Sequence, residues 1–167
     1  MRNATSFADR ELLISRHFEF PREIVYRSWV DLNLALQWWG PPESPAIHAQ
    51  MDLRPGGAWS ARFRAAGHGP EWRTRGIMQE VIPASRLIYT FSMEDAGDRW
   101  PDTLVTMTFV DETAAKTRVT AHQRPFRNRE DRDFCRDAWD LTFDRFAACL
   151  NAAQGAMSTV GATMAAE

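Results

Sequence analysis

The stretch from Asn128 to Ala153, NREDRDFCRDAWDLTFDRFAACLNAA, has the clearest periodicity in the chain and predicts one long amphipathic helix. Trp139, Phe143, Phe146 and Leu150 follow one another at spacings of four, three and four residues, which places them in one stripe along a helix. Acidic residues open the segment, as the helix dipole favours. Because such a stripe is stable only when it is covered, the helix must pack against another element.

The covering element is predicted to be a sheet, because the preceding residues alternate between apolar and polar side chains. Between Ala58 and Arg64, for example, Trp59, Ala61 and Phe63 share one face, and serine and arginine side chains share the other. Similar segments, separated by turn residues, predict strands at 11–20, 46–53, 58–65, 71–82, 86–93, 103–110 and 117–123. Consecutive strands with short connections form an antiparallel meander, whose apolar face would pack on the helix.

Two short helices are predicted after the first strand. One spans 22–30 and follows a proline, and the other spans 34–39 and ends at Gly40-Pro41-Pro42. Adjacent helical residues diverge by about 100°, so Trp38 and Trp39 should face different surfaces. We expect one of them to anchor the short helix in the core, and Trp39 to lie at the rim of a pocket.

Composition is typical of one globular domain. The chain has 167 residues with a net charge of −2, and 44% of the residues are hydrophobic. Interspersed charges give no reason to expect binding to nucleic acid or to an anionic membrane surface. No apolar run reaches the roughly 20 residues that span a bilayer, and the N-terminus lacks a secretory signal pattern, so a cytoplasmic protein is expected.

We predict a flexible N-terminus over 1–9, a single domain over 10–154 and a disordered C-terminal tail over 155–167. Cys135 and Cys149 lie on the predicted long helix about 20 Å apart, beyond the roughly 7 Å between Cα atoms that a disulfide spans. Both are therefore expected to be reduced.

Several ordered motifs resemble one family. They are FPREIVYRSWVD (20–31), WWGPPE (38–43), DLRPGGAW (52–59), EVIPASRLIYT (80–90), KTRVT (116–120) and AWDLTFDRFAACL (138–150). On these motifs residues 10–152 resemble the START-like (SRPBCC) superfamily, in the branch related to the C-terminal domain of the activator of Hsp90 ATPase.

The resemblance implies an α+β helix-grip fold. In this fold a curved antiparallel sheet, here of about six or seven strands, wraps around the long C-terminal helix, with two short helices after the first strand. The superfamily's deep, largely apolar cavity holds lipids, polyketides, hormones or other hydrophobic compounds and occasionally hosts catalysis. The family name also suggests chaperone work and stress response, but a name alone is weak evidence of function.

A small hydrophobic ligand between sheet and helix is therefore the leading functional hypothesis, and a solid core is the alternative. Glu80 and Tyr89 are the candidate polar anchors, because each could share the inner face of its strand. The alternatives are a surface glutamate at the strand end and a buried tyrosine that pairs within the core. The full set of predicted ligand contacts is Trp39, Trp59, Phe63, Met78, Glu80, Tyr89, Phe91, Met107, Phe109, Trp139 and Phe143.

Two other hypotheses stay open. A module that docks a chaperone or another protein predicts exposed aromatic residues, such as Trp72 or Trp100. A cavity enzyme of the cyclase or hydrolase type predicts an inward-facing ionisable group among Glu80, Tyr89 and His122. Catalysis is less expected than binding, and no catalytic residue is assigned.

Metal and cofactor sites are not expected. The four histidines are scattered without ligand spacing, and no glycine-rich phosphate loop is present. Self-association as a homodimer through an exposed strand edge is left open. The arginines of the central hairpin are interpreted as a solvated outer face of the sheet; they are Arg62, Arg64, Arg73 and Arg75.

Overall fold

The computed structural model of the chain describes residues 7–95 and 97–164. Its elements, in order, are η1 (Phe7–Arg10), β1 (Leu12–Phe18), α1 (Arg22–Val30), α2 (Leu32–Trp38), β2 (Ala46–Met51), β3 (Ala58–Arg64), β4 (Glu71–Ile82), β5 (Arg86–Asp95), β6 (Asp98–Arg99), β7 (Thr103–Thr113), β8 (Lys116–Arg124) and α3 (Arg129–Met164). One antiparallel sheet runs in the order β1-β8-β7-β5-β4-β3-β2, and the two-residue β6 pairs with β5 outside this path. The predicted helix-grip arrangement is confirmed.

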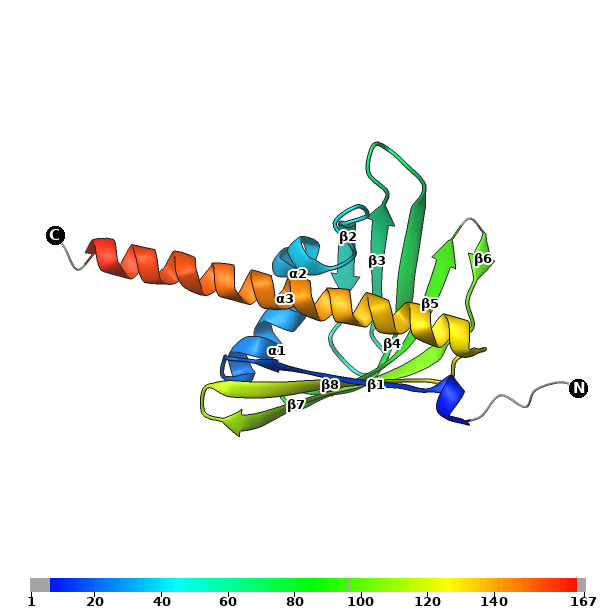
Figure 1. The fold of residues 1–167 in the computed structure, drawn as a ribbon, viewed down its shortest axis with the longest axis horizontal. Helices are drawn as coiled ribbons and strands as arrows, with labels where there is room; N and C mark the ends of the chain where they lie inside the picture. The colour runs from blue at the N-terminus through cyan, green and yellow to red at the C-terminus, as the bar shows by residue number, and fades with distance from the viewer. Residues whose placement is uncertain (1–6, 96, 165–167) are drawn as a thin grey trace, which may run out of the picture.

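Figure 1 shows α3 crossing one face of the curved sheet, with α1 and α2 on the same side. The meander runs from β2 to β8, and β1 forms the edge strand beside β8. The register between the first and last strands is regular: Leu12 lies opposite Gln123, and Phe18 lies opposite Thr117. The sheet therefore joins segments that are far apart in the chain.

The two short helices are fixed by local capping. Asp31 caps α2, because its carboxylate accepts hydrogen bonds from the backbone N–H of Asn33 at 2.8 Å and of Leu34 at 3.3 Å. The helix ends before Gly40, which adopts a φ of +84°. A side chain at that position would come within 2.6 Å of the Phe63 ring, so glycine serves both the backbone turn and the close approach.

The solid part of the core lies under residues 143–150, near the middle of α3. Phe143, Phe146 and Leu150 are buried there, as their spacing predicted. The Phe146 ring packs edge-on against Phe18 at 5.3 Å and Trp29 at 5.0 Å between ring centroids. These contacts join α3 to β1 and α1, so this part of the helix holds the layers together.

The structure describes part of both predicted terminal segments. Asp9 in η1 forms ion pairs with α3, to Arg129 at 2.8 Å and to Arg132 at 3.5 Å. Helix α3 continues to Met164, although a disordered tail was predicted from residue 155. Extending an existing helix adds one hydrogen bond per residue, which allows this Ala-containing segment to follow the helix before it. Residues 1–6 and 165–167 of the two predicted segments lie outside the described residues.

Two further features bear on the predictions from sequence. Within residues 7–95 and 97–164, no helix is long and apolar enough to cross a membrane. Cys135 is buried and Cys149 is half-buried, and both are free thiols, as predicted.

Candidate ligand cavity

A cavity of about 390 Å³ lies between the sheet and the first turns of α3. One wall comes from β3, β4 and β5, and the opposite wall comes from the α3 segment 134–142. Gly40 and Pro41, in the connection after α2, lie on its border. Phe134 of α3 lines the cavity and is 54% exposed, so the cavity reaches the surface near this residue. The volume falls within the range of pockets that take small organic molecules.

Seven of the predicted contact residues line this cavity. They are Trp39, Trp59, Phe63, Met78, Tyr89, Phe91 and Trp139. Five come from the inner faces of β3 to β5, where period-two alternation placed them, and Trp39 directly follows α2. Trp139 comes from the stripe of α3.

Met107, Phe109 and Phe143 were predicted to line the cavity but lie in the solid core outside it. All three are essentially fully buried. Phe109 packs edge-on against Tyr26 of α1 at 5.4 Å, and Phe143 packs against Phe18 at 6.0 Å. Their faces were predicted correctly, but α1 and the middle of α3 fill the space between sheet and helix at these positions. The sequence pattern reports the face of a residue and does not report whether a neighbour covers it.

Glu80 also lies outside the cavity, for a different reason. The pairing of β4 with β5 shifts by one residue between Met78 and Glu80, so alternation does not carry across this bulge. The Glu80 carboxylate instead forms an ion pair with Arg86, and both side chains are partly exposed. The predicted inward-facing carboxylate is thus replaced by a surface ion pair.

Five tryptophans form a continuous stacked series along the cavity. The indole centroids are separated by 6.2 Å between Trp139 and Trp29 and by 4.6 Å between Trp29 and Trp38. They are separated by 5.8 Å between Trp38 and Trp39 and again between Trp39 and Trp59. Interplanar angles along the series stay at or below 29°. All five line the cavity, and we call this series the tryptophan wall.

The pair Trp38-Trp39 serves the two purposes expected of it. Trp38 is 2% exposed and packs against Phe146, so it anchors α2 to the core. Trp39 is half-buried and lies between Trp38 and Trp59 at the cavity border. Trp38 also lines the cavity, which was not expected for the anchoring residue.

Few polar atoms face this aromatic lining, and two of them are unsatisfied. Among the described residues, Thr74 Oγ1 and Trp38 Nε1 are buried, line the cavity and have no hydrogen-bond partner within the protein. The Tyr89 hydroxyl has only a weak contact, 3.5 Å from the Met107 sulfur. A buried polar group without a partner is costly, so a ligand that hydrogen-bonds to these atoms would remove that cost.

Gln123 holds one side of the cavity in place. Its Nε2 donates to Thr103 at 2.8 Å, and its Oε1 accepts from the Trp139 indole N–H at 2.8 Å. Because Gln123 belongs to β8 and Trp139 to α3, this link fixes the position of the indole between sheet and helix. Gln123 was not among the predicted contacts, and no local pattern marks its role.

Two ionisable groups of the cavity, Tyr89 and Cys135, favour their neutral forms. Burial raises the pKa of the Tyr89 hydroxyl well above its usual value of 10.0. Burial, with a smaller contribution from the charge of Asp131, raises the pKa of the Cys135 thiol to about 12. A thiol that acts as a nucleophile or general base needs a lowered pKa, not a raised one. These residues therefore suit binding better than catalysis.

The pKa of Cys135 predicts a loss of stability in alkali. Because the folded-state pKa lies above the usual value of 9.0, the thiol's contribution to stability is complete below about pH 9 and falls as the pH rises towards 12. We expect a decrease of about 1.4 kcal/mol per pH unit in that window. Urea denaturation of the wild type and of Cys135→Ala at pH 8, 9.5 and 10.5 measures this effect. The free energy of unfolding of the wild type should fall more steeply with pH than that of Cys135→Ala. Parallel pH profiles for the two proteins would contradict it.

His122 and Trp100 lie outside the cavity, whereas Trp72 lines it. The His122 Nε2 atom lies 2.8 Å from a carboxylate oxygen of Glu11, within hydrogen-bonding distance. Trp72 stacks on Phe63 at 3.9 Å and lines the cavity, and Trp100 is half-buried beside Phe134. Within the described part of the chain, no group of three His, Cys, Asp or Glu residues is placed to hold a metal ion.

A signal for the helical wall was present in the sequence but was not used. Cys135, Ala138, Trp139 and Thr142 follow the spacing of one helix face, and all four line the cavity. Three of them are small. Small side chains on a helix face that opposes large aromatic residues indicate space rather than tight packing.

The sequence profile of the Activator of Hsp90 ATPase homolog 1-like proteins matches residues 19–151. The chain belongs to this family. The match spans both short helices, the meander and the cavity-lining part of α3, so every element that borders the cavity lies within it. The resemblance to the SRPBCC-type fold noted from the motifs is thereby confirmed, whereas no curated protein matches the chain.

Solved structures of other family members share the fold at low identity. An AHSA1 protein from Silicibacter pomeroyi is 24% identical with a TM-score of 0.73, and the alignment covers 84% of this chain and 97% of that one. An AHSA1-like protein from Aeromonas hydrophila is 20% identical with a TM-score of 0.73, over 86% and 94%. A protein from Chromobacterium violaceum is 24% identical with a TM-score of 0.70, over 83% and 96%. These likenesses concern the fold alone.

Proposed function

We propose that this AHSA1-like protein binds a small, largely aromatic molecule in the cavity between β3–β5 and α3. The observation that carries the proposal is the tryptophan wall, which faces a cavity of about 390 Å³. A flat ring system laid against parallel indoles gains both apolar burial and favourable stacking. Branched or strongly charged molecules would lose one or both of these contributions.

The unsatisfied polar atoms add a preference for one polar group on the ligand. Thr74 Oγ1 can donate or accept a hydrogen bond, whereas Trp38 Nε1 can only donate. The ligand should therefore carry a hydroxyl or carbonyl oxygen beside its apolar body. A hydroxyl can serve Thr74 as donor or acceptor, and a carbonyl can serve either residue as acceptor.

Binding is favoured over catalysis because the groups considered for catalysis are either protonated or outside the cavity. Tyr89 and Cys135 have raised pKa values and stay protonated at neutral pH. Glu80 pairs with Arg86 and His122 contacts Glu11, both outside the cavity. A neutral hydroxyl and thiol can orient a ligand but supply little driving force for proton transfer or nucleophilic attack.

The test uses 2-naphthol and naphthalene, which share an aromatic body and differ in one hydroxyl. We expect both to bind the wild type, as followed by NMR chemical-shift changes in the methyl groups of Met78 and Leu87, with tighter binding of 2-naphthol. Thr74→Val should weaken 2-naphthol binding by about three- to tenfold and leave naphthalene unchanged, because only the first loses a hydrogen bond. An equal loss for both compounds would contradict the assigned role of Thr74.

A second pair of variants tests the location of the site. Thr142→Trp places a large side chain on the cavity face of α3 and should abolish binding of both probes. Ala148→Trp adds the same side chain at an exposed position of the same helix and should leave binding unchanged. Native mass spectrometry of freshly purified protein would reveal a co-purified compound, and its chemistry should match one aromatic body with one oxygen. Failure of both probes to shift any cavity resonance would overturn the proposed function.

A further inference from the structure

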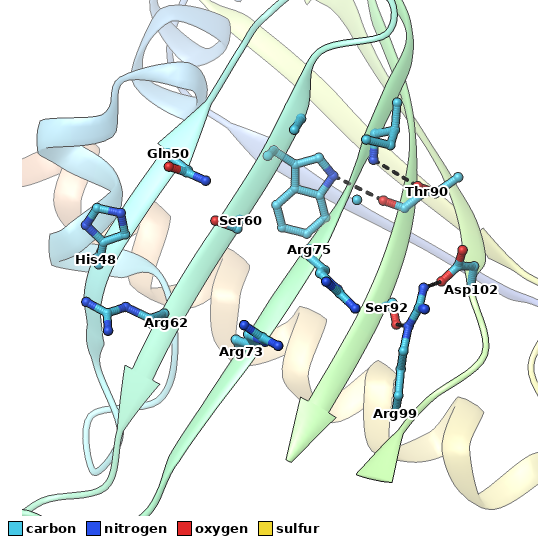
Figure 2. Close-up of a pocket in the computed structure, with 14 residues that line it drawn as sticks. His48, Gln50, Ser60, Arg62, Arg73, Arg75, Thr90, Ser92, Arg99 and Asp102 are labelled. Atoms are coloured by element: carbon cyan, nitrogen blue, oxygen red, sulfur yellow. Dashed lines mark hydrogen bonds and ion pairs between the residues drawn. The ribbon is translucent and has the colours of Figure 1, made fainter. Parts of the chain in front are cut away.

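A second hollow of about 620 Å³ lies on the opposite face of the sheet from the cavity. Its floor is formed by the outward-facing side chains of β2 to β5, with β6 at one side (Figure 2). We call this hollow the outer groove. Unlike the cavity, it is lined largely by polar and basic side chains, and Figure 2 shows Arg73 and Arg75 near its centre.

Strand register places a basic row straight across the groove. His48 of β2 lies opposite Arg62 of β3, and Arg62 lies opposite Arg73 of β4. Arg73 lies opposite Glu94 of β5, which in turn lies opposite Arg99 of β6. Like charges directly opposite one another in a sheet are destabilising, so the neighbouring positions of Arg62 and Arg73 require a compensating contribution.

The carboxylates nearby do not supply that contribution for Arg62. Glu94 forms ion pairs with Arg73 at 2.8 Å and with Arg75 at 3.5 Å, so it is shared between two guanidinium groups. The ion pair of Arg62 is longer than these, with 3.9 Å between its guanidinium nitrogen and a Glu71 carboxylate oxygen.

Glu71 has a closer partner of its own. Its carboxylate accepts a 2.9 Å hydrogen bond from Arg64 Nε. On the far side of the groove, Asp102 pairs with Arg99 at 2.8 Å. The centre of the groove therefore carries more guanidinium charge than carboxylate charge.

Neutral hydrogen-bonding groups lie beside this charge. Ser60 lies opposite Arg75 on the neighbouring strand, and Gln50 lies opposite Ser60. In Figure 2 Ser60 lies between Gln50 and the central arginines. These groups could contact the uncharged part of a molecule whose anionic group lies among the arginines.

We propose that the outer groove binds a small molecule through a dianionic oxygen group, either a phosphate or a pair of carboxylates, held by Arg62, Arg73 and Arg75. Guanidinium groups bind such oxygens through paired, charge-assisted hydrogen bonds. The anion offsets the repulsion between Arg62 and Arg73 that the register imposes. This site is separate from the cavity and goes beyond the function proposed for it. Arg62, Arg73 and Arg75 lie on the exposed outer face of the sheet, as interpreted from the sequence, and the proposal assigns a ligand to that face.

The test is isothermal titration calorimetry with sodium pyrophosphate, sodium phosphate and sodium succinate at low ionic strength. We expect at least one of the three to bind in the millimolar range or tighter, with affinity that falls as sodium chloride is added because exposed charges are screened. Pyrophosphate and phosphate binding without succinate binding assigns a phosphate group, and the reverse assigns a dicarboxylate. Polyglutamate is titrated as a comparison. If none of the three small anions binds, the proposal is overturned, and binding of polyglutamate alone would indicate an acidic protein partner instead.

Two matched arginine variants locate the site. Arg62→Gln removes the guanidinium that has only the long ion pair and should weaken the anion that binds by about tenfold, the loss expected for one charge-assisted contact. Arg118→Gln, on β8 and outside the groove lining, should change that affinity less than twofold. Equal losses in the two variants would show non-specific charge attraction and overturn the proposal.

Thermal unfolding without added anion gives an independent readout. Arg62→Gln should melt at the same temperature as the wild type or higher, because it removes repulsion from Arg73. Added anion should raise the melting temperature of the wild type more than that of Arg62→Gln. A lowered melting temperature of anion-free Arg62→Gln would contradict the repulsion on which the proposal rests. Because 2-naphthol binding reports on the cavity alone, failure at either site is distinguishable from failure at the other.

Discussion

Phe146→Ala is expected to lower the free energy of unfolding by about 3–5 kcal/mol, the usual cost of removing a buried phenylalanine ring. Phe146 is fully buried in α3. Its ring meets Phe18 of β1, Trp29 of α1 and Trp38 of α2 at centroid distances of 5.0–5.3 Å. Since four elements converge on this one ring, little local movement can close the space that alanine leaves.

Guanidinium denaturation followed by circular dichroism measures this loss, and Phe134→Ala is the matched control. Phe134 belongs to the same helix but is 54% exposed, so its removal should change stability by less than about 1 kcal/mol. Because Phe146 supports Trp29 and Trp38, its alanine variant should also bind 2-naphthol more weakly than the wild type does. Similar losses of stability in the two variants would refute the assignment of the solid core to residues 143–150 of α3.

Gly76→Ala is expected to destabilise the protein by about 3 kcal/mol or more, although it adds a single methyl group. A Cβ atom at Gly76 would overlap the Thr90 carbonyl oxygen on β5, and its position is fixed by the backbone. The two strands must therefore separate locally. Separation would weaken two hydrogen bonds: the one from Trp59 Nε1 on β3, across β4, to the Thr90 carbonyl, 3.1 Å, and the one from the Ile77 N–H on β4 to Thr90 Oγ1, 2.9 Å.

Chemical denaturation measures the cost, and the indole N–H resonance of Trp59 reports on the lost contact. Gly67→Ala is the control, since it lies at a hairpin tip with nothing within 4 Å of the added methyl and a φ of +71°. It should cost only about 1 kcal/mol, from left-handed backbone strain. If Gly76→Ala lowered the free energy of unfolding no more than Gly67→Ala does, this would contradict the close approach of β4 and β5 at Gly76.

Gly76 also connects the two sites described above. Both Gly76 and Trp59 border the outer groove, and Trp59 is at the same time the last member of the tryptophan wall. Because Trp59 lies beside Gly76 and lines both hollows, a change at Gly76 alters the lining of both. Gly76→Ala should accordingly weaken 2-naphthol binding as well as stability.

Local patterns in the sequence were sufficient for most of the fold. The stripe of Phe143, Phe146 and Leu150 predicted the buried face of α3, and alternation predicted that Trp59 and Phe63 face inward. These predictions succeed because helix and strand geometry fix the direction of a side chain relative to its near neighbours in the chain. The family motifs added the topology and the presence of two short helices.

The same patterns were insufficient where a distant segment or a break in regularity intervenes. Phe109 faces inward as predicted, but Tyr26 of α1 covers it, which local spacing does not contain. Glu80 does not lie on the predicted inner face, because the bulge after Met78 changes the register by one residue. Gln123 supports Trp139 through a contact between β8 and α3 that neither segment encodes alone.

The sequence by itself determined the order of the elements, the inner and outer faces of the strands and the family of the protein. Only the tertiary structure decided that β1 pairs with β8, that five tryptophans stack into one wall, and where a cavity remains between helix and sheet. The reason is physical. The face of a residue depends on the backbone geometry of a few neighbours, whereas an open volume depends on how far apart distant side chains hold two layers.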